Sequence, residues 1–271
     1  MITLAYDEEV AWWGQAESSR DEIAHYVAFS GGVESGVVLD DGGRIRAFAL
    51  VTPTQEAIVF LDPAEPDPPL TLMYDWALAQ GATRAELPPD VPPRIDWLKS
   101  RGWTHTRSAF DLIRAGTEPA GDPVWPAGVR VRPYRRGEDD VAMHRLVYVD
   151  AAFASVPGHP DRPVEAWRQM FTAENVRGWV VERGERPVGW VIGRVSDDGH
   201  GWVYQLAVAV DERGVGLGRA LLLHSFADLL AAGATSLGLA VQAANDRAIG
   251  LYRSVGLRAE KEWQVYERGS D

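Results

Sequence analysis

The chain has 271 residues, a length that suits two domains of ordinary size better than one compact domain. Its 46% hydrophobic and 24% charged residues are typical of a globular protein, since disordered chains hold too few apolar residues to offset the entropy lost on ordering. The formal net charge of -12, from 27 basic and 39 acidic residues, disfavours nucleic acid or anionic lipid as a partner over most of the surface.

Several further classes of protein are excluded by what the sequence lacks. It contains no cysteine, so disulfides, thiolate zinc sites and cysteine nucleophiles are ruled out. The start of the sequence has neither the basic residues nor the apolar run of a signal peptide, and no stretch of about 18 apolar residues is present to span a membrane. His144 and His159 lack partners at metal-ligand spacing, so we expect no metal site. A cytoplasmic protein is the expectation.

Prolines and glycines gather between Ala115 and Gly128 without apolar periodicity, which is the composition of a linker. The segments on both sides are patterned as mixtures of helix and strand. The sequence therefore predicts one domain over residues 1–116, a linker over 117–128, and a second domain over 129–271.

The second domain shows helical spacing and strand alternation in turn. Helices are predicted over Glu138–Phe153, Pro163–Thr172, Arg219–Ala231 with a C-cap at Gly233, and Asn245–Ser254. Strands are predicted over Val129–Arg132, Trp179–Glu182, Pro187–Val195, Trp202–Val210, Ser236–Val241 and Leu257–Tyr266.

The first domain repeats part of this order. Residues 79–83 resemble 231–235, and residues 95–102 resemble 249–256. Two matches in the same order at nearly constant offset indicate an internal duplication.

The two copies differ where chemistry is expected. Between Asp62 and Gly81 the first copy has prolines at positions 63, 66, 68 and 69 and no glycine, and proline has no N–H to offer an anion. The residue that matches Tyr252 is Leu98, which cannot transfer a proton. The first copy is therefore predicted to keep the fold without a site.

In the second copy, a predicted strand enters the turn Arg213-Gly214-Val215-Gly216-Leu217-Gly218, and a helix follows at once. Glycines permit positive φ and close backbone approach, so that successive N–H groups and a helix N-terminus can bind a phosphate. Arg213 and Arg219 can add charge-assisted contacts. A glycine pattern alone is weak evidence, and the turn lacks the Lys-Ser/Thr of a P-loop and the last small residue of a dinucleotide fingerprint.

Two motifs together are more specific. Arg213, Gly216 and Gly218 match the Arg/Gln-x-x-Gly-x-Gly/Ala pyrophosphate loop of the GNAT acetyltransferases, and residues 245–257 resemble the Asn-x-x-Ala-x-x-Leu-Tyr-x-x-x-Gly-Phe segment of that family, with Leu257 in place of Phe. The chain thus resembles the GNAT superfamily over residues 129–268. The duplication extends the resemblance to two-domain members of the mycothiol synthase type over nearly the whole chain.

The resemblance implies a mixed α/β fold of two tandem GNAT-like domains, each a mostly antiparallel sheet flanked by helices, with the N-terminal domain degenerate. It implies acetyl-CoA (coenzyme A) as cofactor and a monomer or homodimer. It also implies that the strand Leu206 to Val210 splays from its neighbour, so that Val208 and Val210 bind the amides of the pantetheine arm while the loop amides hold the pyrophosphate. The cofactor-binding residues it implies are Leu206, Val208, Val210, Arg213, Gly214, Val215, Gly216, Leu217, Gly218, Arg219 and Asn245.

The resemblance makes Tyr252 the general acid, which gives its proton to the leaving thiolate, although a buried helix tyrosine would fit the pattern too. Many family members carry a glutamate base on the strand before the loop, whereas residues 202–206 here read Trp-Val-Tyr-Gln-Leu. A water chain ending at a backbone carbonyl, Tyr204, a loop carboxylate or an amine that arrives neutral would each serve. The loop Phe153–Val164, with His159 and Asp161 and next to Asp150, would cover the acceptor.

Besides protein N-acetylation, which needs an open groove for a peptide, three functions follow from the resemblance. The first is transfer of an acetyl group to the primary amine of an unspecified small molecule. The second is acetylation of a thiol-sugar amine, as in mycothiol synthesis. The third is binding of acyl-CoA without turnover in a regulatory role.

Overall fold

The computed structural model of the chain describes residues 35–52, 55–64, 69–153, 162–169 and 175–269, together with Thr3, Ala5, Asp7, Glu8, Ala11 and Phe171. It divides into two compact units. Unit 1 comprises Met1–Phe110, Gln242–Ala244 and Lys261–Asp271, and unit 2 comprises Asp111–Val241 and Asn245–Glu260. Within the described ranges, no helix is long and apolar enough to cross a membrane.

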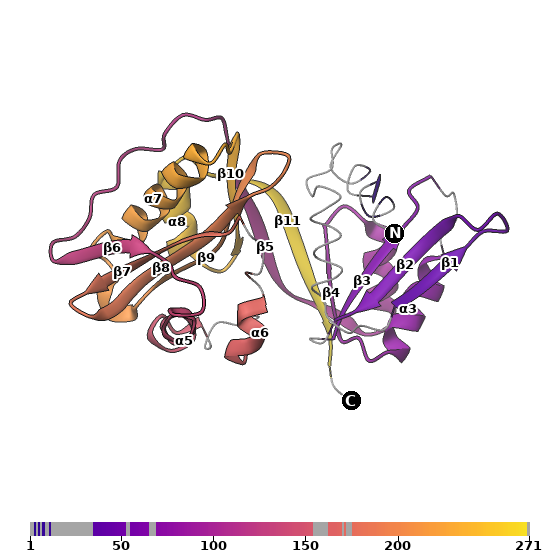
Figure 1. The fold of residues 1–271 in the computed structure, drawn as a ribbon. Helices are drawn as coiled ribbons and strands as arrows, with labels where there is room; N and C mark the ends of the chain where they lie inside the picture. The colour runs from indigo at the N-terminus through magenta and orange to yellow at the C-terminus, as the bar shows by residue number, and fades with distance from the viewer. Residues whose placement is uncertain are drawn as a thin grey trace. The chain divides into compact units, whose positions relative to one another are not determined.

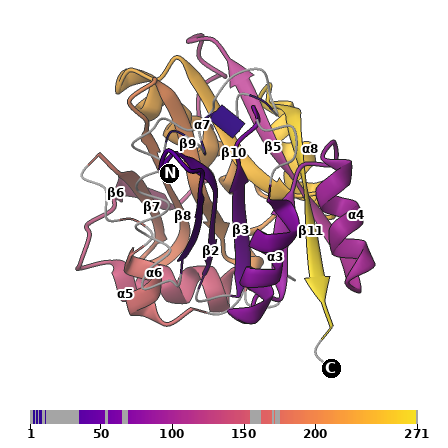
Figure 2. The same cartoon turned by 90° about the vertical axis from the view of Figure 1, so that its right-hand side faces the viewer.

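Unit 1 contains a sheet with its described helices packed against one face (Figure 2). Its strands lie in the order β1-β2-β3-β4-β11-β5, and β3 and β4 run parallel. The strands are β1 (Ser35–Leu39), β2 (Ile45–Val51), β3 (Glu56–Leu61), β4 (Arg84–Leu87) and parts of β5 (Trp103–Ala115) and β11 (Arg258–Arg268). The helices are α3 (Leu70–Ala79) and α4 (Pro92–Ser100).

Strand alternation builds the core of unit 1. Every second residue of β3 is buried, because side chains on a strand alternate between its two faces. One face packs on α3, where Met73 and Tyr74 are buried. Glu8 and Arg94 form a buried ion pair in this unit, and Glu8 also accepts a hydrogen bond of 2.9 Å from the N–H of Leu61. The buried charge is therefore paired, as an ion in an apolar interior must be.

Unit 2 has the strand order β6-β7-β8-β9-β10-β5. Figure 1 shows α7 and α8 on one face of this sheet and α5 and α6 on the other. The strands are β6 (Val129–Pro133), β7 (Arg177–Arg183), β8 (Arg186–Val195), β9 (His200–Val208) and β10 (Ser236–Gln242). The helices are α5 (Asp140–Arg145) with a π-helical turn (Leu146–Asp150), α6 (Val164–Gln169), a 3-10 turn (Val210–Glu212), α7 (Leu217–Ala231) and α8 (Asp246–Ser254).

Aromatic side chains fill the layer between α5, α6 and the sheet of unit 2. Trp167 and Trp190 are fully buried, with ring centroids 5.2 Å apart, and Phe171 meets both rings edge to face. Such tilted arrangements suit the charge distribution of aromatic rings and add to the free energy of burial.

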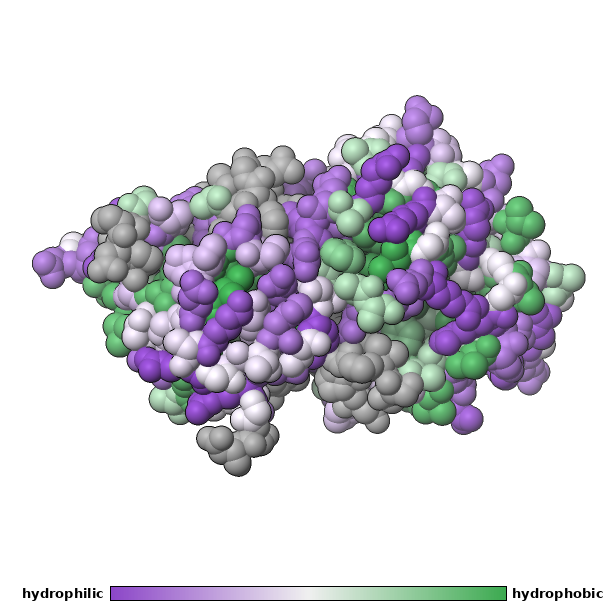
Figure 3. All heavy atoms as spheres, turned by 180° about the vertical axis from the view of Figure 1, so that it is seen from behind, coloured by the Kyte–Doolittle hydropathy of each residue, from purple (hydrophilic) through white to green (hydrophobic). Residues whose placement is uncertain are grey.

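In the view from behind, hydrophilic residues cover much of the surface, and hydrophobic ones show as patches among them (Figure 3).

The internal repeat falls on matching elements. In each half a helix ends at a glycine with positive φ, Gly81 at 87° and Gly233 at 101°. The next residue closes the turn, since Ala82 donates to the carbonyl of Ala77 and Ala234 to that of Leu229, both at 3.0 Å. A strand, a second helix and a further strand follow in both halves. The sequence match therefore corresponds to a repeated β-α-β-α-β segment.

The final strands of the two repeats are exchanged. β5 follows α4 in the chain but neighbours β10 in unit 2, whereas β11 follows α8 but pairs antiparallel with β4 in unit 1, where Glu267 faces Arg84. Residues 261–271 therefore group with unit 1, and unit 2 begins at Asp111. Residues 116–128 form no helix or strand.

Candidate active site

Strand β9 carries a β-bulge at Tyr204. On the neighbouring strand Gly193 faces Val203 and Ile192 faces Gln205, so that Tyr204 is the extra residue of the bulge. The pairing of β9 with β10 covers His200, Gly201 and Trp202, and the described residues of β10 pair with none of β9 beyond that point. The two parallel strands therefore diverge after Trp202.

The divergence begins where Trp202 faces Gly238. A Cβ atom at Gly238 would come within 2.6 Å of the Trp202 ring and 2.7 Å of the Ile113 side chain, so only glycine lets the indole lie over β10. Bulges commonly occur beside active sites, because they bend a strand and redirect its side chains. The combination of a bulge with a large side chain over a glycine gives the splay a local cause.

A 3-10 turn leads from β9 to the glycine loop, and its acidic residues are neutralised. Glu212 is buried and accepts two hydrogen bonds from Arg183, at 2.7 and 2.9 Å, and Arg183 holds the pKa of that carboxyl below its ordinary value. Asp211 is paired with Arg186 at 2.7 Å. The carboxylates next to the loop are thus occupied by arginines of β7 and β8, which lowers their repulsion of an anion at the loop.

The loop itself has the backbone of an anion site. Gly214 and Gly216 have φ of 88° and 89°, a region that side-chain-bearing residues rarely adopt, and open space lies where their Cβ atoms would be. Gly216 precedes α7, whose first hydrogen bond runs from Ala220 to the Gly216 carbonyl at 3.0 Å. Within the described part of the chain, no group accepts a hydrogen bond from the amides of residues 214–219. These N–H groups and the helix N-terminus suit a phosphate.

Arg213 differs from the expectation. Its side chain donates to backbone carbonyls, from Nε to Val208 at 3.2 Å and from Nη2 to Ala151 at 2.6 Å, and does not extend over the loop. Its N–H donates to the carbonyl of Val210 at 3.4 Å, so the amides available to an anion begin at Gly214. The prediction that the strand continues to Val210 is wrong, because β9 ends at Val208 and Val210 lies in the 3-10 turn.

Arginines lie at the start of both helices that follow the loop and β10. Arg219 is exposed in the first turn of α7, and Arg247 is exposed in the first turn of α8. Burial and the positive charge of Arg247 lower the pKa of Arg213, so these two guanidinium groups lie close enough to repel each other. Within the described residues none of the three forms an ion pair with a carboxylate. A locally cationic site therefore exists on a chain with a net charge of -12.

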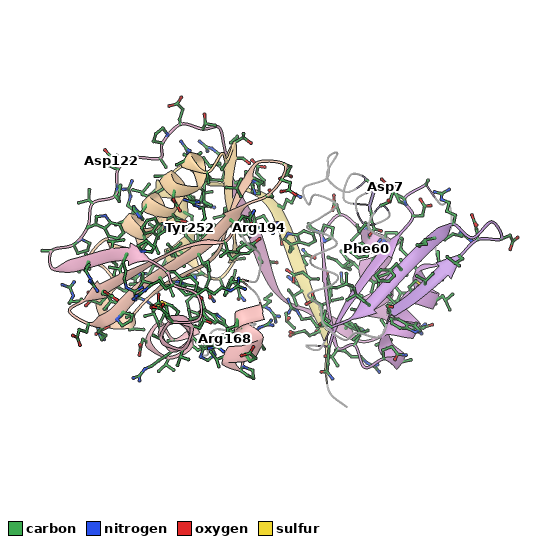
Figure 4. The ribbon with its side chains drawn as sticks, viewed as in Figure 1. Asp7, Phe60, Asp122, Arg168, Arg194 and Tyr252 are labelled. Atoms are coloured by element: carbon green, nitrogen blue, oxygen red, sulfur yellow. The ribbon has the colours of Figure 1, made fainter. Side chains whose placement is uncertain are left out.

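Tyr252 is on α8, against the sheet of unit 2, while Arg168 comes from α6 on the opposite face (Figure 4). Tyr252 is 9% exposed, and burial raises the pKa of its phenol to about 12. The hydroxyl therefore keeps its proton at any pH at which the fold is expected to persist. The same burial makes donation of that proton to a thiolate harder, because two pKa units correspond to about 2.7 kcal/mol.

Asn245 caps a helix. Its Oδ1 accepts a hydrogen bond of 3.2 Å from the N–H of Ala248, which satisfies one of the donors at the start of α8. The resemblance implied that Asn245 contacts the cofactor arm. The cap places its side chain at the start of the helix that carries Tyr252.

Replacing Asn245 with Ala is expected to lower the free energy of unfolding by about 1 kcal/mol, since that is the usual cost of losing an N-cap. Asn245→Ser retains the cap and should restore most of that loss. Chemical denaturation measures both variants, and calorimetry with coenzyme A measures binding. A stable Asn245→Ser variant that has lost affinity for coenzyme A would show that the amide serves the cofactor as well.

Two consecutive side chains of β9 contact α6 and Phe171, which follows it in the chain. The ring of Tyr204 lies 6.5 Å from that of Phe171, and Gln205 accepts a hydrogen bond of 3.2 Å from Nε1 of Trp167. An indole can only donate, so the Gln205 carbonyl faces Trp167 and its amide NH₂ points elsewhere. The bulge at Tyr204 explains how neighbouring residues share one face.

The other residues predicted near the acceptor are only partly covered by the structure. Asp150 ends the π-helical turn, with Arg145 3.9 Å away. His144 contacts the carbonyl of Arg162 at 2.6 Å and the ring of Tyr148 at 4.7 Å, so it has a packing role. His159 and Asp161, with most of the predicted covering loop, lie outside the described residues.

Comparison with known proteins identifies the family. A family model described as the acetyltransferase (GNAT) family matches residues 144–257. A mycothiol acetyltransferase of Frankia alni is 30% identical over 259 residues, which cover 88% of this chain and 72% of that protein. The chain belongs to the GNAT acetyltransferase family. It is thus an acyltransferase of that family, as its two motifs predicted.

Other GNAT proteins are similar over different lengths. A mycothiol acetyltransferase of Thermobispora bispora is 33% identical over 176 residues, 62% of this chain, and the match spans only 59% of that relative's length. The structure of a tandem GNAT protein from the clavulanic acid biosynthesis pathway covers 100% of this chain and 94% of its own, with a TM-score of 0.76 and 14% identity. That likeness confirms the predicted mixed α/β fold of a tandem GNAT protein.

Proposed function

We propose that this GNAT protein transfers the acetyl group of acetyl-CoA to the primary amine of a small thiol-sugar. The similarity to mycothiol acetyltransferases over 88% of the chain carries the proposal for the acceptor. It favours this acceptor over the unspecified amine that the sequence motifs alone put first. The site supports the donor, because the glycine loop and the splayed edge of β9 both suit coenzyme A.

The described residues fit acetyl-CoA. Bound acetyl-CoA would supply the acetyl group as a thioester. The amides of residues 214–219 hold the pyrophosphate, and the open space beside Gly214 and Gly216 leaves room for it. Beyond Trp202, where the described residues of β9 and β10 no longer pair, the backbone of β9 around Leu206 can offer N–H and C=O groups to the amides of the pantetheine arm. Arg219 adds positive charge at the start of α7.

Tyr252 is the proposed general acid. Its hydroxyl enters the reaction protonated, since the pKa of about 12 lies far above neutral pH. As the amine nitrogen bonds to the acetyl carbon and the thioester C–S bond breaks, the Oη proton would pass to the departing thiolate, and the proton lost by the amine would return to the Tyr252 phenolate through water. Positioned acids of this kind contribute about 10²–10⁴ to rates.

Tyr204 and Gln205 are proposed to line the acceptor site. The two side chains contact α6 and Phe171, and Trp167 fixes the orientation of the Gln205 amide. The outward NH₂ of Gln205 can donate to a hydroxyl or carbonyl oxygen of a sugar-containing acceptor. Aromatic rings such as Tyr204 offer an apolar surface to the face of a sugar ring.

The test compares acceptors directly. The purified protein is incubated with acetyl-CoA and, separately, the unacetylated thiol-sugar precursor of mycothiol, an aminoglycoside-type aminosugar and a polyamine. Products are measured by mass spectrometry, because the free thiol of the first acceptor would confuse a thiol-release assay. Alkylating that thiol beforehand distinguishes N-acetylation from S-acetylation.

We expect N-acetylation of the thiol-sugar with a kcat/KM well above those of the other two amines. Preference for another amine would support the acetyltransferase activity and contradict the proposed thiol-sugar acceptor. Binding of coenzyme A without product from any acceptor would support the regulatory alternative.

A further inference from the structure

The side chain of Arg213 joins three parts of unit 2. The residue begins the glycine loop, its Nε donates to the carbonyl of Val208 at the end of β9, and its Nη2 donates to the carbonyl of Ala151 directly after the π-helical turn. The glycine loop and the end of β9 belong to the proposed cofactor site. Ala151 belongs to the segment that packs with Trp167, on the side of the proposed acceptor site. A rigid guanidinium with several donors is well suited to hold two carbonyls in a fixed relation.

The segment ending at Ala151 is firmly packed at one end and irregular at the other. Leu146 and Val147 are fully buried in the aromatic core with Trp167. Ala151 closes the π-helical turn by donating to the Leu146 carbonyl at 2.7 Å. Ala152 then takes a φ of 57°, which is unusual for a residue with a side chain. π-Helical turns and such φ values are concentrated at functional sites.

Arg213 begins the glycine loop and Arg219 directly follows it, but the two arginines have different surroundings. The guanidinium of Arg213 donates to two carbonyl oxygens, and it is repelled by the guanidinium of Arg247. Arg219 is exposed in the first turn of α7, where an anion held by the loop amides would feel its charge. The two arginines therefore allow a comparison of a bridging role with a phosphate-binding role.

We infer that Arg213 is a positioning residue that couples the cofactor loop to the acceptor-side segment 146–153. This inference rests on the proposed function, because it requires coenzyme A to bind at the loop. An anion held by the amides of residues 214–219 restricts the loop backbone, including the Cα of Arg213. The guanidinium then holds the Ala151 carbonyl more tightly, so that cofactor binding orders the segment that the acceptor meets.

Hydrogen exchange of the full chain, with and without saturating coenzyme A, tests the coupling. In the wild type we expect coenzyme A to slow exchange of amides in segment 146–153 by at least about fivefold, the lower end of the usual coupling between two sites. Arg213→Met keeps the length of the side chain and removes its donors. It should still bind coenzyme A but show no such slowing at saturation, and Arg213→Lys, which can reach one carbonyl, should restore part of it.

Arg219→Met is the matched control. It should weaken coenzyme A binding and yet, once saturated, slow exchange in segment 146–153 as the wild type does. Slowing that persists in Arg213→Met would overturn the coupling, as would a wild type that binds coenzyme A without any change in this segment. A wild type that does not bind coenzyme A at all would instead overturn the proposed function itself, and the coupling with it.

Discussion

Replacing Tyr252 with Phe is expected to lower kcat by about 10²–10⁴-fold, the usual contribution of a positioned general acid. The change removes one oxygen atom and leaves the ring in place. Affinity for coenzyme A and the free energy of unfolding should change little, because no described residue is recorded as a hydrogen-bond partner of the hydroxyl. A loss of rate without a loss of binding separates proton transfer from packing.

Steady-state kinetics, calorimetry with coenzyme A and thermal unfolding measure these three quantities. Tyr266→Phe is the matched control, since Tyr266 is a buried tyrosine of unit 1 that is hydrogen-bonded to Gln264 at 2.9 Å. The Tyr266→Phe variant should have a lower free energy of unfolding and an unchanged kcat. A Tyr252→Phe variant with wild-type kcat would show that Tyr252 is not the general acid and only packs in the core.

The pH dependence of the wild type supplies a second reading of Tyr252. Burial raises the pKa of the phenol to about 12, so its acid form persists in alkaline solution. We therefore expect no decline of kcat that could be assigned to ionisation of this group up to about pH 10, whereas an unshifted phenol would be half ionised there. The profile of kcat is informative because it reports groups in the bound complex.

The second large effect is expected at Gly216. Gly216→Ala places a Cβ on a residue with φ of 89°, at a cost of about 1–2 kcal/mol for a left-handed conformation. Apart from Gly216 itself and its two chain neighbours, no described residue has an atom within 4 Å of that Cβ, so the cost is torsional within the fold, and the methyl group projects into space that we assign to the pyrophosphate. The dissociation constant of coenzyme A should rise by at least about tenfold as the loop relaxes.

Gly218→Ala is the control on the same loop. Its φ is not in the left-handed region, and its Cβ would lie 3.6 Å from Leu251 and Val208, an ordinary contact distance. Alanine at this helical position should raise stability by about 0.5–1 kcal/mol and leave coenzyme A binding within about threefold of wild type. Equal losses of affinity in both variants, measured by calorimetry, would contradict the role of the Gly216 backbone.

Local sequence signals predicted the loop and the elements around it. Glycine at 214 and 216 reports the positive φ that the turn requires, and Asn245 marks the start of α8, so both features are properties of a few adjacent residues. The strands and helices of the second copy also appear close to their predicted limits. Periodicity is enough for these because it records which side of an element is buried.

The direction of side chains and the pairing of distant strands could not be predicted. The two carbonyls that bind Arg213 belong to residues 5 and 62 positions away. The hydrogen bond that orients Gln205 comes from Trp167, on a helix 38 positions earlier. The salt bridges that neutralise Glu212 and Asp211 come from neighbouring strands. No local pattern carries such information, because it arises when segments far apart in sequence are folded together.

The exchanged strands make each copy depend on the other. β4 obtains a neighbour from the last strand of the chain, and β10 obtains one from the strand that follows α4. A gene that encoded either copy alone would leave an open sheet edge in its product, and open edges favour aggregation. The first copy therefore acts as a folding partner of the second, because it supplies a strand that completes the sheet next to the glycine loop.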